Sequence, residues 1–322
     1  MLRTFVFVLP LAATLLPAQT DLWMTDFAKA KEKAKAEKKD LLIDFTGSDW
    51  CSWCIKLDEE VFSKEAFAAQ APKSFVLVKL DYPRKKELPA ELKEQNKKLA
   101  EQYPIQGYPT ILLTDAEGLV YGQTGYQPDG PEKYLAMLAD LQQKGADFQK
   151  AMAGANGKKD AERAAALHTA LSALEEEVVN THHFACMEEI VKLDADGKAG
   201  LKEKYATRVQ QIGEGRAIDR EATMLNELIG PLMQEGKGKE ALAKIAEVVK
   251  APKNKVQHQL AMFFQGMLTM DVEADAKTAL ATLEAAKALA PESPIGKRID
   301  QILPELKQQV EKDKGEKKEG GK

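Results

Sequence analysis

Apolar positions in the first half of the chain fall into two patterns, short continuous runs and helical spacing. The continuous runs predict buried strands at Leu41–Phe45, Phe75–Asp81, Ile111–Thr114 and Leu119–Tyr121. The helical spacing predicts amphipathic helices over Asp21–Lys39, from Cys51 onward, over Lys85–Gln102 and over Pro131–Leu141. This order of elements predicts an α/β arrangement around one mixed sheet.

From about Phe148 onward the pattern is helical, and no run is typical of a strand. Lys239–Ile245 and Lys277–Leu283 resemble each other, as the hairpins of degenerate tetratricopeptide (TPR) repeats do. We therefore expect an α/β domain over residues 21–145 and an all-α helical domain, with TPR-like hairpins as one form of it, over residues 146–310. The mixed charges and glycines of residues 311–322 predict a disordered tail.

The first residues have the pattern of a secretory signal peptide. Arg3 precedes an apolar run from Thr4 to Ala18, which ends in small residues and is too short to span a bilayer. We expect residues 1–18 to be removed and the mature protein to be periplasmic or extracellular, with an uncleaved membrane anchor as the alternative. No later segment is apolar enough to cross a membrane, so we expect no span after signal removal.

Composition narrows the class of protein. With 322 residues, of which 44% are hydrophobic and 30% charged, the chain is long enough for two soluble globular domains. The formal net charge is only −4, and the basic residues are matched by acidic ones. We therefore expect no nucleic-acid partner.

The three cysteines are too few for a disulfide scaffold, and two of them form the motif Cys51-Ser52-Trp53-Cys54. A C-x-x-C between a strand and a helix in an exported protein favours a redox pair. Cys51 would begin the helix, where unpaired N–H groups and the helix dipole stabilise a thiolate, so we expect it to be the nucleophile. Cys54, one turn further on, is the expected resolving thiol.

From about Asp21 to Lys144 the chain resembles the thioredoxin superfamily, particularly exported thioredoxin-like proteins and the C-terminal domain of the membrane disulfide-interchange reductase. The matching residues are Ile43-Asp44-Phe45, Trp50-Cys51-Ser52-Trp53-Cys54, Val78-Lys79-Leu80-Asp81, Gly107-Tyr108-Pro109-Thr110 and Gly125. The resemblance implies a thioredoxin fold, exchange of the Cys51–Cys54 disulfide with protein thiols and disulfides, and a separate redox partner. We expect neither a metal nor an organic cofactor.

The resemblance also implies how substrate is held. Pro109 would follow a cis peptide bond beside the disulfide, where the backbone of Tyr108 is offered to a bound substrate chain. Trp50 and Trp53, which flank Cys51, would contact the same substrate.

A buried carboxyl near the cysteines is implied as well. Asp44 would lie below the disulfide with a raised pKa and would accept the proton of Cys54 as that thiol attacks. Lys79 would be its partner. An ordinary ion pair of the sheet between Asp44 and Lys79 is the alternative.

Two segments depart from the family pattern. The turn Thr46–Asp49 leaves one residue more than usual before Cys51, and the connection Lys85–Gln102 is longer than in the minimal fold. We expect the connection to be a solvated insertion, with a role in partner choice as the alternative.

Other interpretations stay open. The helical domain could recruit a protein partner and leave the redox pair secondary, or the C-x-x-C could be a purely structural disulfide. His182, His183 and Cys186 are close in sequence but do not complete a ligand set, so we expect solvent-facing histidines and a buried helical cysteine.

Overall fold

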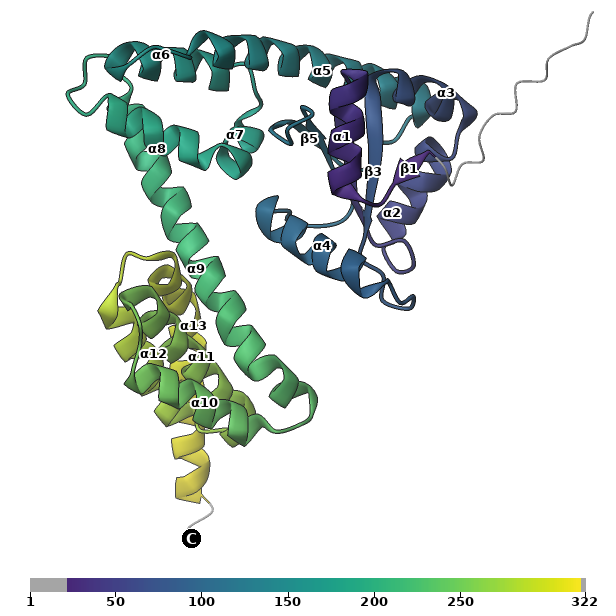
Figure 1. Cartoon of the computed structure of the whole chain (residues 1–322). Coiled ribbons are helices and arrows are strands. Elements are labelled where there is room, and N and C mark those ends of the chain that lie inside the picture. Colours follow the sequence, from purple (N-terminus) through teal and green to yellow (C-terminus); the bar gives the residue numbers. More distant parts are fainter. Residues whose placement is uncertain (1–21, 320–322) are drawn as a thin grey trace, which may run out of the picture. The chain divides into compact units, whose positions relative to one another are not determined.

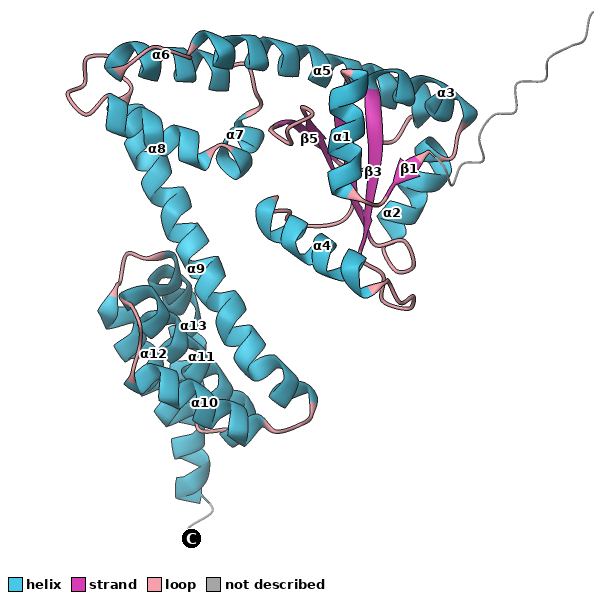
Figure 2. Cartoon of the chain, in the orientation of Figure 1, coloured by secondary structure: helices cyan, strands magenta, loops and turns pink. Residues whose placement is uncertain are grey.

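The structure is a computed structural model that describes residues 22–319, with side chains up to residue 313. The segment 1–18, for which the sequence predicts a signal peptide, lies outside the described residues. The chain divides into two compact units, the first ending at Ala206 and the second beginning at Thr207. The strands of the described residues all belong to the first unit, and the second is helical (Figures 1 and 2). The predicted order of an α/β region followed by an all-α region is confirmed.

One mixed sheet of five strands forms the centre of the first unit (magenta in Figure 2). Its order is β1-β3-β2-β4-β5, with bounds Trp23–Met24, Phe75–Asp81, Asp40–Thr46, Thr110–Thr114 and Val120–Thr124 in that order. β2 runs parallel to β3 and antiparallel to β4. The apolar runs of β2 and β3 are continuous because these strands are covered on both faces.

The first strand corrects the sequence interpretation, which placed Trp23 in a helix. Trp23 and Met24 pair with β3, and α1 (Phe27–Glu37) begins only after Asp26, whose carboxylate accepts the backbone N–H of Lys29. A strand of two residues is too short to show a period of its own. Its pairing partner, and not its local pattern, therefore decides its structure.

Helices pack on the sheet and bury it. They are α1, α2 (Ser52–Leu57) with its π-helical continuation η2 (Asp58–Phe62), α3 (Glu65–Ser74), α4 (Ala90–Gln102) and α5 (Gly130–Gly154). α1 contacts β2 and β3, α3 contacts β3, and α5 contacts β4 and β5.

The first unit continues well past the change in composition. Three more helices follow α5, namely α6 (Asp160–Leu171), α7 (Glu176–His182) and α8 (Phe184–Leu193). α6 packs on α5 and α8, and α7 packs on the edge strand β5. The compact unit therefore does not end near residue 145. The sequence did not indicate this continuation, because a helical period shows that a segment buries one face but not which element it packs against.

The contact between β5 and the following helices depends on a histidine. The side chain of His183 is only 5% exposed, and its Nε2 lies 2.7 Å from the carbonyl oxygen of Val120. Because that oxygen can only accept, Nε2 donates the hydrogen. The imidazole also packs edge-on against Phe148, and burial lowers its pKa. The prediction of a solvent-facing side chain is wrong for His183.

The second unit has its own apolar core. α9 (Lys202–Gln234) crosses the boundary, and α10 (Gly238–Lys250), α11 (Lys255–Glu273), α12 (Ala276–Leu289) and α13 (Pro294–Glu319) follow. Each helix from α10 to α12 packs on the next one, and their buried residues are mainly Leu, Ile and Ala. TPR-like hairpins stay a prediction.

Two further observations concern the ends and the surface of the described chain. α13 continues to Glu319, through most of the segment for which the sequence predicts a disordered tail, because Lys and Glu are good helix formers. Within residues 22–319, no helix is both long enough and apolar enough to cross a bilayer.

The packing of the later helices on β5 predicts that a fragment ending at residue 144 is less stable than one ending at residue 206. The shorter fragment loses the His183 hydrogen bond and uncovers the Tyr121 ring, against which Gly145 packs. We expect its melting temperature, followed by circular dichroism, to be lower by about 5 °C or more. Equal melting temperatures would show that residues 145–206 add nothing to the α/β unit.

Candidate active site

The two cysteines of the C-x-x-C motif form a disulfide at the start of α2, with 5.2 Å between their Cα atoms. Cys51 is the N-cap residue, and its Sγ accepts the backbone N–H of Cys54 at 3.2 Å. The backbone N–H of Gly47 points to the Sγ of Cys54 at 3.5 Å. Cys51 is 7% exposed and Cys54 is 4% exposed. Both sulfurs therefore receive backbone N–H groups, which favour a thiolate over a neutral thiol.

The turn that leads into the cysteines requires a glycine at its start. The backbone N–H groups of Trp50 and Cys51 both donate to the carbonyl oxygen of Gly47, at 3.2 and 2.9 Å. A Cβ atom at Gly47 would lie only 2.5 Å from the Trp50 indole. The Trp50 side chain therefore folds directly back over the turn, which no other residue at this position permits.

An aspartate of this turn attaches it to the loop after β3. The Asp49 carboxylate accepts the backbone N–H groups of Arg84, Lys85 and Lys86, at 2.9, 2.8 and 3.0 Å. These three donors hold the pKa of Asp49 below its usual value. The sequence interpretation missed this role, because an Asp in a turn gives no signal about a loop more than thirty residues away.

The neighbouring serine makes a second attachment. Ser48 donates its backbone N–H and its hydroxyl to the two carboxylate oxygens of Asp81, at 2.9 and 2.6 Å. Asp81 is the last residue of β3, so the turn is tied both to the strand end and to the loop that follows it.

Trp50 is held within an aromatic cluster. Its Nε1 donates to the carbonyl oxygen of Tyr82 at 2.8 Å, and its ring lies edge-on to Tyr108 at 5.6 Å between centroids. The Tyr82 and Tyr108 rings are 5.3 Å apart, and the Arg84 guanidinium lies 3.7 Å above the Trp50 ring. A guanidinium on an indole face is a favourable cation–π contact. Trp50 thus has a clear structural role in addition to the substrate contact that the resemblance implies.

Trp53 is presented to solvent. It is 54% exposed, and its ring lies 5.2 Å from that of Tyr126. The ammonium of Lys56 lies within 5.5 Å of both ring centroids, and the Tyr126 hydroxyl donates to Glu60 at 2.6 Å. Trp53 is therefore an exposed aromatic residue of the motif, and the half-buried Tyr126 packs against its ring. Tyr126 is absent from the sequence interpretation.

The loop before β4 lies close to this site. The Tyr108–Pro109 peptide bond is cis. A Cβ at Gly125 would lie 3.1 Å from the carbonyl oxygen of Pro109, so the glycine allows these two loops to approach each other.

Asp44 is a buried carboxyl in the middle of β2. It is 3% exposed, and its Oδ1 has no hydrogen-bond partner. Burial raises its pKa from 3.8 to about 7, against the opposing effect of Lys79.

Lys79 does not act as the hydrogen-bond partner of Asp44. The two residues are directly opposite in the β2–β3 register, but the Lys79 ammonium donates to Asp58 of η2 at 3.3 Å. Asp44 and Lys79 are therefore neighbours on adjacent strands but not a hydrogen-bonded pair, because the Lys79 ammonium binds the more exposed carboxylate of Asp58.

The histidines and the third cysteine lie elsewhere. His182 is 2.9 Å from the side-chain oxygen of Gln123, and Cys186 belongs to α8. Burial raises the pKa of the Cys186 thiol to about 11. The described residues contain no group of three or more His, Cys, Asp or Glu side chains that could hold a metal ion.

Comparison with known proteins places the α/β region in a well-defined group. A family model described as a thioredoxin-like domain matches residues 27–142. The disulfide bond reductase DsbH of Chlamydia pneumoniae is 34% identical over 121 residues, which are 38% of this chain and 73% of that protein. The thioredoxin-related protein DsbJ of the same organism is 29% identical over 96 residues, which are 30% of this chain and 28% of that protein.

A solved structure of the DsbH oxidoreductase is also similar. It has 30% sequence identity, and the match covers 44% of this chain and 94% of that chain with a TM-score of 0.37. Each of these matches covers less than half of the present chain.

The raised pKa of Asp44 predicts a stability that depends on pH. Between its unfolded value of 3.8 and its folded value of about 7, the folded protein keeps a proton that the unfolded chain has lost. The free energy of unfolding therefore falls as the pH rises through this window. Asp44→Asn removes this titration. The free energy of unfolding of the variant minus that of the wild type should therefore be more positive at pH 8 than at pH 5, by on the order of 2 kcal/mol.

Urea denaturation of the oxidised protein at the two pH values measures this difference. Asp140→Asn, which removes an exposed carboxylate of α5, is the matched control and should show no comparable change between them. An Asp44→Asn effect of equal size at pH 5 and pH 8 would contradict a raised pKa.

Proposed function

Because this chain belongs to the thioredoxin-like family, we propose that it is a thiol–disulfide oxidoreductase that exchanges its Cys51–Cys54 disulfide with protein thiols. The observation that carries the proposal is the position of the pair. Cys51 caps the helix and receives a helical N–H, while Cys54 lies one turn behind it with less exposure. This is the arrangement that one attacking and one resolving thiol require.

The reaction proceeds in two exchanges. In the reduced protein, the Cys51 thiolate attacks one sulfur of a substrate disulfide, forms a mixed disulfide and releases the other sulfur as a thiolate. Cys54 then loses its proton and attacks the Sγ of Cys51, which releases the second substrate thiolate and closes the Cys51–Cys54 disulfide. Two electrons pass from the pair to the substrate, and a separate redox partner restores the dithiol.

Electron flow towards the substrate is part of the proposal. It is supported by the similarity to a protein named as a disulfide bond reductase. It is also supported by Ser52 and Trp53, since neither residue supplies a cation that would make the Cys51 thiolate very stable and the pair strongly oxidising.

We assign the proton of Cys54 to Asp44. The carboxyl is buried, its Oδ1 is without a hydrogen-bond partner, and its pKa of about 7 suits proton transfer at neutral pH. Lys79 and Asp58 act on it through their charges, one lowering and one raising the pKa of Asp44.

Substrate contact is assigned to Trp53 and to the backbone of Tyr108, with Trp50 shaping the surface between them. The exposure of the Trp53 ring beside Cys51 supports the first assignment. The place of Tyr108 in contact with Trp50 supports the second.

Export to the periplasm or the cell exterior is proposed from the N-terminal pattern. The sequence reads Arg3 and then an apolar run to Ala18, as in a signal peptide that is removed.

A second role, recruitment of a protein partner, is proposed for the helical unit. Helical hairpin arrays commonly serve as interaction surfaces.

The three cysteines give a direct test of the redox role. Cys51→Ser should lower the rate of insulin disulfide reduction to the uncatalysed rate, because a hydroxyl cannot form the mixed disulfide. Cys54→Ser should instead accumulate a mixed disulfide with insulin, visible on a non-reducing gel. Cys186→Ser is the matched control and should keep full activity, since burial keeps that thiol protonated.

Insulin reduction that survives Cys51→Ser would contradict the assignment of the nucleophile. A loss of activity in Cys186→Ser equal to that in Cys51→Ser would contradict the site itself.

A further inference from the structure

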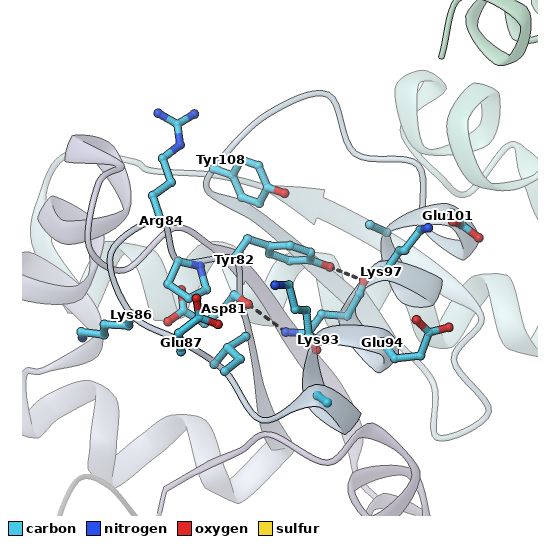
Figure 3. Close-up of a pocket in the computed structure, with 15 residues that line it drawn as sticks. Asp81, Tyr82, Arg84, Lys86, Glu87, Lys93, Glu94, Lys97, Glu101 and Tyr108 are labelled. Carbon is cyan, nitrogen blue, oxygen red and sulfur yellow. Dashed lines mark hydrogen bonds between the residues drawn. The ribbon is translucent and has the colours of Figure 1, made fainter. Parts of the chain in front are cut away.

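A groove of about 860 Å³ lies between the loop after β3 and helix α4, and its lining includes Tyr108, the residue before Pro109 (Figure 3). Its apolar surface comes from Tyr82, Leu88, Ala100 and Tyr108. The volume is within the range of about 300–1,000 Å³ in which proteins hold drug-sized ligands, so the groove has room for several residues of a peptide.

The aromatic floor of the groove is held rigidly. The Tyr82 hydroxyl donates to the carbonyl oxygen of Asn96 at 2.7 Å, and the Asn96 amide donates to the carbonyl oxygen of Asp81 at 2.8 Å (dashed in Figure 3). On its inner side the Tyr82 ring stacks with Phe45 of β2. A surface that is already ordered costs less conformational entropy when a ligand binds.

The loop after β3, which forms the other wall, is held by residues of the turn Gly47–Trp50 before Cys51, which we call the redox turn. Asp49 accepts three successive N–H groups of this loop, and Trp50 donates to the carbonyl oxygen of Tyr82. The groove is therefore linked to Cys51 through Tyr108, which lines it, and through Trp50, which contacts Tyr108 and precedes Cys51 in the chain.

The charges of the groove restrict what it can hold. The charged side chains labelled in Figure 3 are four basic and four acidic ones. A nucleic acid or another polyanion gains no net attraction from such a surface. An uncharged polypeptide backbone with an apolar side chain fits it, because the ring faces and aliphatic carbons give burial and the rim gives hydrogen-bonding groups.

We propose that this groove binds an extended segment of the substrate polypeptide, and that an aromatic side chain close to the reacting cysteine packs against the rings of Tyr82 and Tyr108. This inference rests on the proposed oxidoreductase function and names a class of substrate for it. The lengthened connection between β3 and β4 is then a specificity element, which selects cysteines by the residues around them.

The test uses reduced full-length protein and nonapeptides with one central cysteine. Each peptide carries that cysteine as a mixed disulfide with 5-thio-2-nitrobenzoate, on a background of Ala and Ser, with a single Phe moved from position −4 to +4. Attack by Cys51 on the peptide sulfur releases the coloured thiolate and leaves the peptide on Cys51, and Cys54 then releases the peptide as a thiol. The mixed disulfide of 2-mercaptoethanol with the same chromophore measures the cysteine chemistry without a peptide.

Rates are expressed relative to that small disulfide. We expect Phe at one position, or at two adjacent positions, to raise the second-order rate constant about tenfold over the peptide without Phe. Ala100→Trp and Lys97→Trp, which fill the groove, should remove this gain. Lys98→Trp, an exposed α4 residue that does not line the groove, should keep it. If Ala100→Trp does not fold, the exposed Lys97 position decides the outcome.

Several results would overturn the proposal. One is a rate that does not depend on the position of Phe. A second is a gain that persists in Lys97→Trp. A third is a Lys97→Trp effect that is confined to glutathione disulfide, which would assign the groove to a small thiol. Failure of wild-type protein to react with the small disulfide faster than Cys51→Ser would instead contradict the oxidoreductase function.

Discussion

The position of β2 in the middle of the sheet is the constraint on which the rest of the site depends. β2 is hydrogen-bonded along both edges, to β3 and to β4, and its residues from Leu41 to Thr46 are buried. A strand held in this way cannot shift its register without moving its apolar side chains out of the core. Thr46 and Asp81, which end β2 and β3, therefore lie opposite each other. The turn before Cys51, which follows β2, and the loop that follows β3 therefore leave the sheet side by side.

The consequence is that the redox turn and the loop after β3 support each other. Ser48 binds the strand end, Asp49 binds the loop and Trp50 binds the carbonyl of Tyr82. Each of these contacts joins residues more than thirty positions apart in sequence. Together they fix the start of α2, where Cys51 receives a helical N–H group, and they form the wall of the groove. Asp44, in the same strand, stays buried and protonated up to near neutral pH.

The sequence allows the sheet and the cysteines to be predicted well, because both depend on local signals. Continuous apolar runs identify β2 and β3, and a C-x-x-C after a strand predicts Cys51 at a helix start. The family resemblance, and not a local signal, names Lys79 as the partner of Asp44, and the two residues lie opposite each other in the β2–β3 register. It does not predict that the ammonium turns to Asp58, because competition between two carboxylates depends on side-chain geometry and exposure.

Features that depend on distant partners are the ones that sequence patterns miss. Asp49 reads only as a turn residue, and its three N–H donors come from another loop. His183 reads as a polar helix residue, and burial against β5 is a property of the packed unit. The continuation of the first unit to Ala206 has the same origin, since α6 to α8 look like the helices of the second unit in composition.

The measurement that tests the central claim most directly is the reduction potential of the Cys51–Cys54 pair, obtained by equilibration with thiol–disulfide buffers. A pair that cycles between dithiol and disulfide should have a potential in the range of redox-active proteins, between about −270 and −120 mV. A potential below about −300 mV, typical of structural disulfides, would contradict the account.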